Sequence, residues 1–251
     1  MACHLFVAFG TIPSGVATRI AAVPDIYPST TSPVGVRLPA WKIVAAFASG
    51  VHLTHTQLVA PSFSRVGNPF VRPVQRGALR ALTDPNFCLL FDRPLRLELD
   101  EVLSALMTQD AGIDEEVAVA LWVADKIDPV PEGDAFWVEY TSTTSADAGA
   151  WRQLDIQLET LPEGEYAITG MEHSSQSCIA ARLVLPGLNV RPGVLGIAGT
   201  YIGTRAHRAF YEGRLGLYGT FKTSSLPKIE TLISTGTDTD HIGYLRVVRV
   251  A

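Results

Sequence analysis

The sequence predicts an all-β fold made of two tandem jelly-roll β-sandwiches or barrels, with short helices between strands. Short apolar runs of strand length are separated by prolines, glycines and polar turns along the whole chain. Alternation is clearest in residues 151–158, where Leu154, Ile156 and Leu158 fall on one side of an extended chain. These three side chains are therefore expected in the core, and the whole run is expected to be one half-buried strand.

A repeated series of features indicates that the fold arose by internal duplication. A Leu-Pro pair opens a unit and a Val-Arg-Pro triplet closes it, first in residues 38–74 and again in residues 161–194. Each copy contains a strand-like run, a polar turn and a second apolar run that ends at a proline. The copies lie roughly 120 residues apart, which is the size of a small all-β domain rather than of a solenoid repeat.

The echo extends on both sides of this unit, in the same order in each half. Paired strands, helices and closing runs are expected in residues 6–9 and 136–140, 17–22 and 151–158, 76–82 and 206–212, 87–91 and 215–221, 94–99 and 227–233, and 117–123 and 242–250. The third pair is expected to be helical. Chance supplies single matches, but not the whole ordered series.

The boundary between the halves is expected at residues 126–133, where two prolines disfavour a helix. The first jelly roll would then span residues 1–125 and the second residues 134–251. The closing runs are β-branched and nearly continuous, which is typical of central strands buried on both faces. Trp122 and Val247, inside those runs, are expected in the core. Residues 95–106 begin with alternation and continue at helical spacing, so a strand followed by a helix remains open there.

Composition bounds the class of protein. The chain of 251 residues is 47% hydrophobic and only 18% charged, which excludes disorder. The net charge of −5 and the absence of any Lys/Arg run argue against sequence-specific nucleic-acid binding. The three cysteines show neither a disulfide framework nor metal-ligand spacing, and buried free thiols are expected. Neither a signal peptide nor a run of about 20 apolar residues is found, so a soluble protein made in the cytoplasm is expected.

Motifs for catalysis are missing. The sequence has no dinucleotide fingerprint, phosphate loop, nucleophile elbow or zinc-protease motif, so no catalytic, cofactor-binding or metal-ligating residues are expected. His52 and His55 stand three apart, and His173 holds the corresponding turn of the second copy. Residues three apart on a strand point to opposite faces, which favours solvated loop histidines over a metal site.

Acidic residues precede both closing strands at matching positions, namely 114–116 in the first half and Asp238 and Asp240, with His241, in the second. Carboxylates in pairs can serve acid and base chemistry or bind calcium. Polar turns flanking hydrophobic strands are the favoured interpretation.

Tryptophan and arginine each leave two interpretations. Packing in the core or at an interface is favoured over a sugar-stacking platform for the four tryptophans, Trp41, Trp122, Trp137 and Trp151. Arg72 and Arg191 each precede the proline that closes a repeat. Each arginine pairs either with a carboxylate across a subunit boundary or with an acceptor inside its own domain.

Two jelly-roll-sized halves with matching strand order, a short helix before the aromatic strand and no enzymatic motif resemble the double jelly-roll (double β-barrel) major capsid proteins of icosahedral viruses and bacteriophages. The resemblance covers nearly the whole chain. It implies a structural protein rather than an enzyme, a homotrimer with a pseudo-hexameric outline, and a capsid lattice in the virion. The implied partners are further copies of the chain, other virion proteins such as a penton protein, and an internal membrane where the virus has one.

Two other classes remain open. A bicupin-like double β-sandwich metalloenzyme would contain bound zinc, iron or manganese in stoichiometric amount. A tandem carbohydrate-binding or adhesin module would bind glycans and lose that binding when Trp137 or Trp151 is replaced. Jelly rolls host all three functions, so the fold by itself does not choose among them.

Overall fold

The computed structural model describes residues 3–20, 42–50, 52–65, 67, 73–75, 89–98, 101–198 and 215–250. These residues form an almost purely β structure, and the one helix among them is the short 3-10 helix η1, Pro61–Arg65. No helix within the described ranges is long and apolar enough to cross a membrane. The described chain divides into two compact units, and the residues before Phe6 group with the second unit, which otherwise begins at Lys126.

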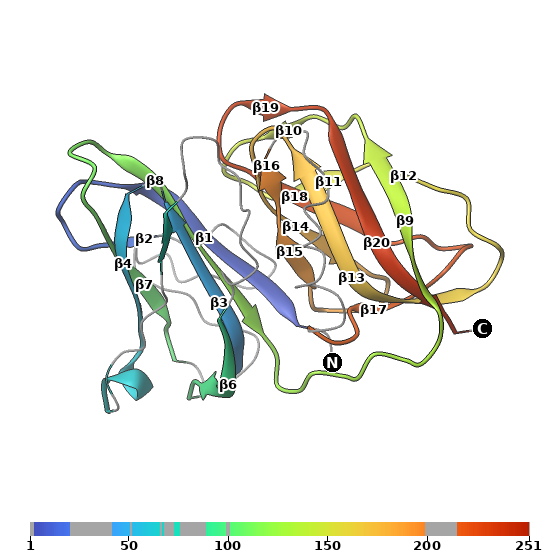
Figure 1. Cartoon of the computed structure of the whole chain (residues 1–251), viewed down its shortest axis with the longest axis horizontal. Coiled ribbons are helices and arrows are strands. Elements are labelled where there is room, and N and C mark those ends of the chain that lie inside the picture. The colour runs from blue at the N-terminus through green and yellow to red at the C-terminus, as the bar shows by residue number, and fades with distance from the viewer. Residues whose placement is uncertain are drawn as a thin grey trace. The chain divides into compact units, whose positions relative to one another are not determined.

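The second unit has the strand order of a jelly roll (Figure 1). Its strands are β9 Ala135–Ser142, β10 Ala146–Asp147, β11 Arg152–Leu154, β12 Gln157–Leu158, β13 Glu165–Ser175, β14 Cys178–Val184, β15 Gly193–Leu195, β16 Ile197–Ala198, β17 Gly219–Lys222, β18 Lys228–Ile233, β19 Thr237–Asp238 and β20 His241–Arg249. One sheet runs β12-β9-β20-β13-β16 with β17 also paired to β13, and the other runs β11-β18-β14-β15. The chain therefore crosses between the two sheets from β9 to β11, from β13 to β14 and from β18 to β20, as two Greek keys require.

The first unit repeats this order. Its strands are β1 His4–Ile12, β2 Thr18–Ile20, β3 Lys42–Gly50, β4 Leu53–Val59, β5 Pro73–Gln75, β6 Leu89–Arg96, β7 Ser104–Gln109 and β8 Glu115–Val123. One sheet runs β1-β8-β3 with β6 on β3, and the other runs β2-β7-β4, which match β9-β20-β13-β17 and β11-β18-β14. In both units a short strand pairs in parallel with a long one, namely β5 with β3 and β16 with β13. The described residues of the first unit contain no strand at the place of β15.

Most of the expected segment pairs occupy equivalent strands, but one pairing is wrong. Residues 94–96 end β6, and β7 instead takes the place of β18 between its neighbours. The strand-or-helix question is decided in the same place, because β7 pairs with β2 and β4 along its length. Pairing on both sides outweighs the local helical spacing. The two expected helices, Trp41 and Arg72 lie outside the described residues.

The run 151–158 is not one strand. β11 pairs with β18 in one sheet, and β12 pairs with β9 in the other. Leu154 is buried, whereas Ile156 and Leu158 are only half-buried, because the chain between them leaves one sheet and joins the next.

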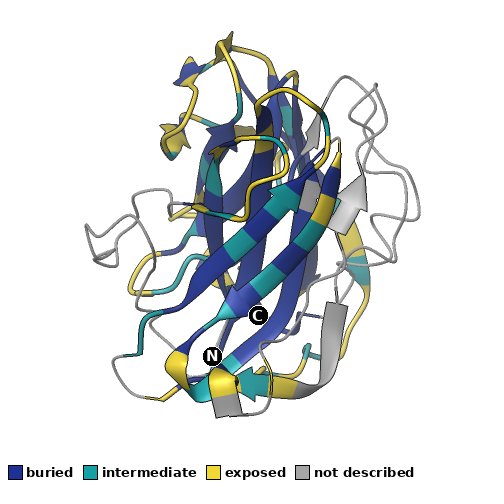
Figure 2. Ribbon diagram, turned by 90° about the vertical axis from the view of Figure 1, so that its left-hand side faces the viewer, coloured by how far each residue is buried: buried dark blue, intermediate teal, exposed yellow. Residues whose placement is uncertain are grey.

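Burial follows the strands, and exposed residues concentrate in the connections (Figure 2). β8 is buried on both faces as predicted, and Trp122 on it is completely buried. β20 differs, because only one of its faces is fully buried. Val247 lies on that buried face. Cys3 and Cys178 are buried free thiols as predicted, and burial raises the pKa of each thiol to about 12.

Replacement of Trp122 tests the packing of β8. Trp122→Ala is expected to lower the free energy of unfolding by roughly 3–5 kcal/mol, because it removes a fully buried aromatic ring. Urea unfolding followed by circular dichroism measures the loss. A loss below about 1 kcal/mol would mean that the indole is not packed.

Candidate functional site

A buried carboxylate fastens the turn between the third and fourth strands of the first unit. Glu115, at the start of β8, accepts the backbone N–H of His52 at 2.8 and 2.9 Å from its two oxygens. The carbonyl of His52 in turn accepts the backbone N–H of Asp110, at 3.3 Å. His52 lies between β3 and β4, which belong to different sheets, and Asp110 lies between β7 and β8, which also do. The two sheet crossings at this end are thereby joined.

The second unit repeats the arrangement with different residues. Asp238 Oδ2 accepts the backbone N–H of Ser177 at 2.7 Å and the hydroxyl of Ser175 at 2.8 Å. The carbonyl of Ser177 accepts the backbone N–H of Ser234, at 2.9 Å. Ser177 directly precedes β14, just as His52 directly precedes β4. We call each of these sets of hydrogen bonds a turn tie.

The turn ties revise the interpretation of the acidic residues before the closing strands. Asp114, Glu116 and Asp240 are exposed, as a polar turn requires. Glu115 and Asp238 are instead buried acceptors of backbone hydrogen bonds. A hydrogen bond to an ionised carboxylate is stronger than one between neutral groups, so these two residues fix the turns.

Removing each carboxylate tests the turn ties. Glu115→Ala and Asp238→Ala are each expected to lower the free energy of unfolding by about 1.5–3 kcal/mol, because a backbone donor loses a charged acceptor. Glu116→Ala and Asp240→Ala are the matched exposed controls and are expected to change it by less than about 0.5 kcal/mol. Urea titration measures all four variants. Equal losses in the buried and exposed variants would contradict the turn ties.

The described histidines form no metal site within either unit. His52 is exposed in its turn and His55 lies in β4, both in the first unit. The expectation of a solvated loop is wrong for His173, which lies within β13 and is fully buried in the second unit. Among the described residues, no group of three histidine, cysteine, aspartate or glutamate side chains is placed to hold a metal ion.

His173 instead belongs to a stack of three rings, which we call the ring stack. Its ring lies between that of Tyr140, with centroids 5.9 Å apart, and that of His241, with centroids 5.5 Å apart. Its Nδ1 lies 2.8 Å from the Tyr140 hydroxyl, which also donates to the carbonyl of Glu172. His241 Nε2 contacts the carbonyl of Thr144 at 3.1 Å.

A glycine makes room for the ring stack. Tyr140 on β9 and His173 on β13 both pair with Gly243, on the strand between them. A Cβ atom at position 243 would lie 2.3 Å from the Tyr140 hydroxyl and 2.2 Å from the carbonyl of Glu172. The Tyr140 hydroxyl reaches His173 across β20 because Gly243 has no side chain. The signal in the sequence was a glycine inside the β-branched closing run, which marks a close approach.

Burial governs protonation in the ring stack. Desolvation, with a smaller contribution from the neighbouring His241, lowers the pKa of His173 to about 3. Burial also lowers the pKa of His241. The largest effect in the opposite direction comes from the carbonyl of Asp238. Burial raises the pKa of the Tyr140 hydroxyl. All three rings are therefore neutral at neutral pH.

A single added methyl group tests the fit of the ring stack. Gly243→Ala is expected to destabilise the protein by about 1–3 kcal/mol or more, because neither contacting oxygen has room to withdraw. Gly10→Ala, in β1, is the matched control, since a Cβ there meets nothing within 4 Å. Thermal unfolding compares the two variants. An unchanged melting temperature for Gly243→Ala would contradict the close packing.

The two described tryptophans of the second unit, Trp137 and Trp151, do not form a joint platform. Trp151 stacks on the buried guanidinium of Arg182, 3.9 Å from the ring centroid, and Arg182 Nε donates to Glu230 at 2.7 Å. Arg182 and Glu230 lie in β14 and β18 of one sheet, and Trp151 directly precedes β11 of the same sheet. Trp137 lies in β9, in the other sheet of the unit. The role of Trp151 is packing against a charged pair.

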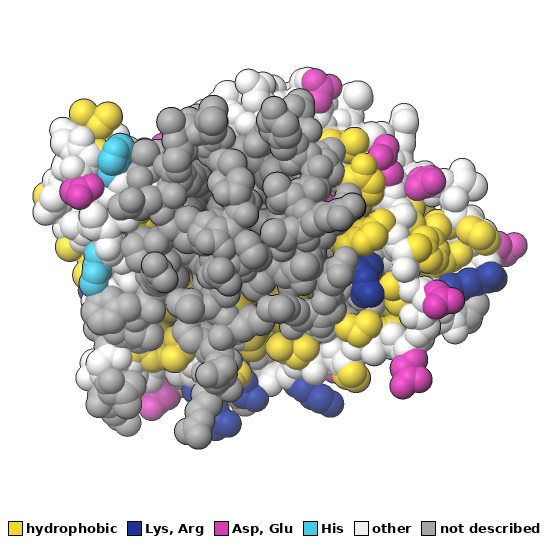
Figure 3. All heavy atoms as spheres, in the orientation of Figure 1, with side chains coloured by type: hydrophobic (Ala, Val, Ile, Leu, Met, Phe, Trp, Pro, Cys, Tyr) yellow, Lys and Arg dark blue, Asp and Glu magenta, His cyan; other side chains and the backbone are white. Residues whose placement is uncertain are grey.

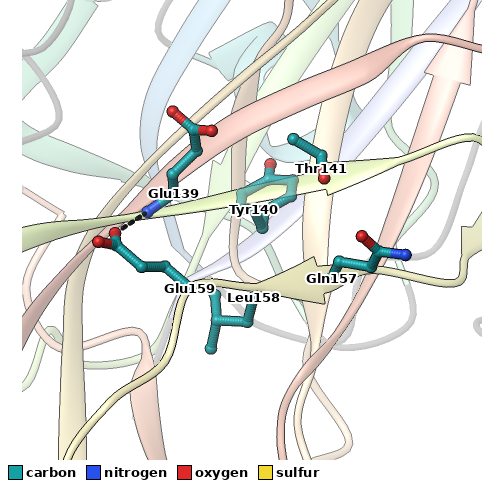
Figure 4. Close-up of a pocket in the computed structure, with 6 residues that line it drawn as sticks. All are labelled: Glu139, Tyr140, Thr141, Gln157, Leu158 and Glu159. Carbon is teal, nitrogen blue, oxygen red and sulfur yellow. Dashed lines mark hydrogen bonds between the residues drawn. The ribbon is translucent and has the colours of Figure 1, made fainter.

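A shallow groove of about 450 Å³ runs between β9 and β12 (Figure 4). It is lined by Glu139, Tyr140, Thr141, Gln157, Leu158 and Glu159. Both carboxylates are already engaged. Glu139 accepts the Tyr244 hydroxyl at 2.8 Å, and Glu159 accepts the backbone N–H of Glu139 at 3.3 Å. The groove lies beside β12, the edge strand of its sheet, and its two carboxylates hold neighbouring segments.

Arg191 is held locally. Its Nη1 donates to the carbonyl of Leu188 at 3.1 Å. Its backbone N–H donates to His4 Nδ1 at 3.0 Å, and its carbonyl accepts the N–H of Leu5 at 2.8 Å. These contacts bind the start of the chain to the second unit.

Two solved structures are similar to the chain over nearly its full length. One is the major capsid protein P2 from bacteriophage PM2, with 8% identity, 97% of this chain and 98% of that chain covered, and a TM-score of 0.25. The other is the STIV MCP, with 8% identity, 97% of each chain covered and a TM-score of 0.26. No family model and no curated protein matches. Both TM-scores are low. The jelly-roll assignment therefore rests on the strand order of the two units.

Proposed function

We propose that the chain is a structural protein of an icosahedral virus or bacteriophage, a major capsid protein whose trimers tile the shell. The observation that carries the proposal is the repetition, within one chain, of a jelly-roll strand order together with its turn tie. Jelly rolls build viral capsids, and also lectins and cupins. The described residues bring together neither a metal-ligand cluster nor a tryptophan platform, so no observation favours those two classes.

A duplicated domain supplies a geometric reason for this role. A subunit with two similar units presents six similar units when three copies close around a threefold axis, which matches a hexagonal position in a lattice. In the proposal, residues 1–125 and 134–251 are the two jelly rolls, and residues 126–133 link them. The partners are further copies, other virion proteins such as a penton protein, and a membrane where one lies beneath the shell. The protein is made in the host cytoplasm and resides in the virion.

Exposed apolar side chains offer contacts for assembly. In the first unit, the turns that carry Val16 and Ile113 are held rigid by Gln109, whose amide donates to the carbonyls of Ile12 and Ile113. Figure 3 shows hydrophobic side chains interspersed with acidic ones over the second unit, at the right of the view. The large exposed hydrophobic residues of the second unit include Phe136, Leu188, Leu226 and Val250. Such surfaces suit association between copies that stay soluble before assembly.

Solution mass is the deciding measurement. Light scattering of the purified protein is expected to give a particle of about three times the 27.0 kDa chain mass, or closed shells. Negative-stain images of the same peak are expected to show a hexagonal outline. A monomer at all concentrations tested would overturn the proposal, and elemental analysis and glycan binding would then test the other two classes.

Arg72 and Arg191 are proposed to contribute to the contact between subunits. Arg72→Glu with Arg191→Glu is expected to reduce the trimer fraction more than the melting temperature, because the arginines close equivalent repeats. Arg249→Glu is the matched control, since this exposed arginine also donates to a backbone carbonyl, that of Glu163. An unchanged mass in the double variant, or an equal loss in the control, would remove the arginines from the interface.

A further inference from the structure

The ring stack of Tyr140, His173 and His241 occupies the interior of the second unit at the end where β20 begins. Its hydrogen bonds fix which ring nitrogens carry protons. The Tyr140 hydroxyl donates to the carbonyl of Glu172, so His173 Nδ1 carries the proton that is donated to the hydroxyl oxygen. A carbonyl only accepts, so His241 Nε2 carries the proton that is donated to Thr144.

This assignment leaves one bare nitrogen on each imidazole. Among the described residues, neither His173 Nε2 nor His241 Nδ1, both buried, has a hydrogen-bond partner, although the carbonyl of Asp238 favours a protonated His241. Protonation of His173 Nε2 creates a buried N–H donor with no acceptor among the described residues. Protonation of both places two like charges on rings whose centroids are 5.5 Å apart. The closed stack therefore does not accept a proton on His173 without opening.

We propose that the ring stack is an acid-sensitive latch that holds the end of the second jelly roll closed at neutral pH and releases it when the histidines take up protons. The proposal concerns a conformational change of the folded chain and does not depend on the proposed capsid role. Its geometry is the cross-strand row of Tyr140 on β9, Gly243 on β20 and His173 on β13. The ring of His241, also on β20, stacks on that of His173.

The released segment is defined by what His241 holds. The carbonyl of Thr144 accepts from His241, and the hydroxyl of Thr144 accepts the backbone N–H of Asp155. The backbone N–H of Thr144 donates to the hydroxyl of Ser142 at the end of β9. Loss of the His241 contact therefore loosens the segment from Ser142 to Thr144 and the start of β20, whereas the later part of the connection stays held by the pairing of β10 with β19.

The other titratable groups around the stack set the strength of the latch. The charges of Asp238 and Asp240 favour a protonated His241, while burial opposes it. Cys178 and Glu172 lie near Tyr140 and disfavour its ionisation. Among the described residues, no acidic group offsets the burial of His173, and its pKa of about 3 lies well below the ordinary histidine value of 6.5. His173 is therefore the main sensor.

The sign follows from proton counting. An opened or unfolded His173 binds a proton below about pH 6.5, whereas the closed one does not until about pH 3. Protons therefore accumulate on the open form, and the closed form loses stability as the pH falls through this window. Each such histidine raises the open population by up to about tenfold per pH unit.

Hydrogen exchange measured by mass spectrometry on the full-length protein tests the latch. Exchange is followed between pH 7.5 and 5, with correction for the intrinsic pH dependence of amide exchange. Peptides from β9, β13 and β20 are expected to show an opening constant that rises between about tenfold and about a hundredfold from pH 6 to pH 5. Peptides from β4 and β7, in the first unit, are expected to change much less and serve as an internal reference.

Glutamine variants identify the sensor. His173→Gln combined with His241→Gln is expected to flatten the pH profile, because glutamine retains hydrogen bonding without titrating. His52→Gln, at an exposed histidine, is the matched control and is expected to retain the wild-type profile. If the double variant does not fold, His173→Gln alone and the wild-type comparison between β20 and β4 decide. A flat wild-type profile, an equal rise in both units, or a rise that persists in the folded double variant would overturn the latch.

Discussion

The arrangement of each unit depends on a single kind of contact. A buried carboxylate accepts a backbone N–H from the turn between β3 and β4 in the first unit, and from the turn between β13 and β14 in the second. That turn crosses from one sheet to the other. The carboxylate lies on the return crossing, which runs from β7 to β8 in the first unit and from β18 to β20 in the second. Fastening the two crossings together sets where both sheets begin. It also requires an acidic residue just before each closing strand, although Glu115 and Asp238 differ in length and their neighbouring residues differ in sequence.

The sequence predicted the parts of the fold that follow from local pattern and repetition. Alternation identified the strands, and the order of repeated segments identified their equivalents, including β8 with β20. Alternation of apolar and polar residues shows that a segment is extended, but it does not show which sheet the segment joins. For this reason residues 151–158 divided between two sheets, and β7 rather than residues 94–99 took the place of β18. Only tertiary pairing distinguishes these cases.

The polar residues were harder to predict, because their roles depend on neighbours from other strands. Repeat alignment placed His173 in a turn, yet β13 extends through it and buries the ring beside Tyr140 and His241. Glu115 and Asp238 were read as turn residues, and burial makes them structural acceptors. In both cases the residue type was informative about polarity, while the contact that gives it meaning joins segments far apart in the chain. Function is accordingly argued from repeated architecture rather than from a reactive group.

The contacts between His4, Leu5 and Arg191 have a consequence for the order of events during synthesis. His4 and Arg191 are 187 residues apart in the chain. A ribosome making about 5–20 residues per second emits the start of β1 many seconds before Arg191 exists. The hydrogen bonds of His4 and Leu5 must therefore form late, after most of the second unit has been translated. The nascent chain spends that interval without the hydrogen bonds that join His4 and Leu5 to Arg191.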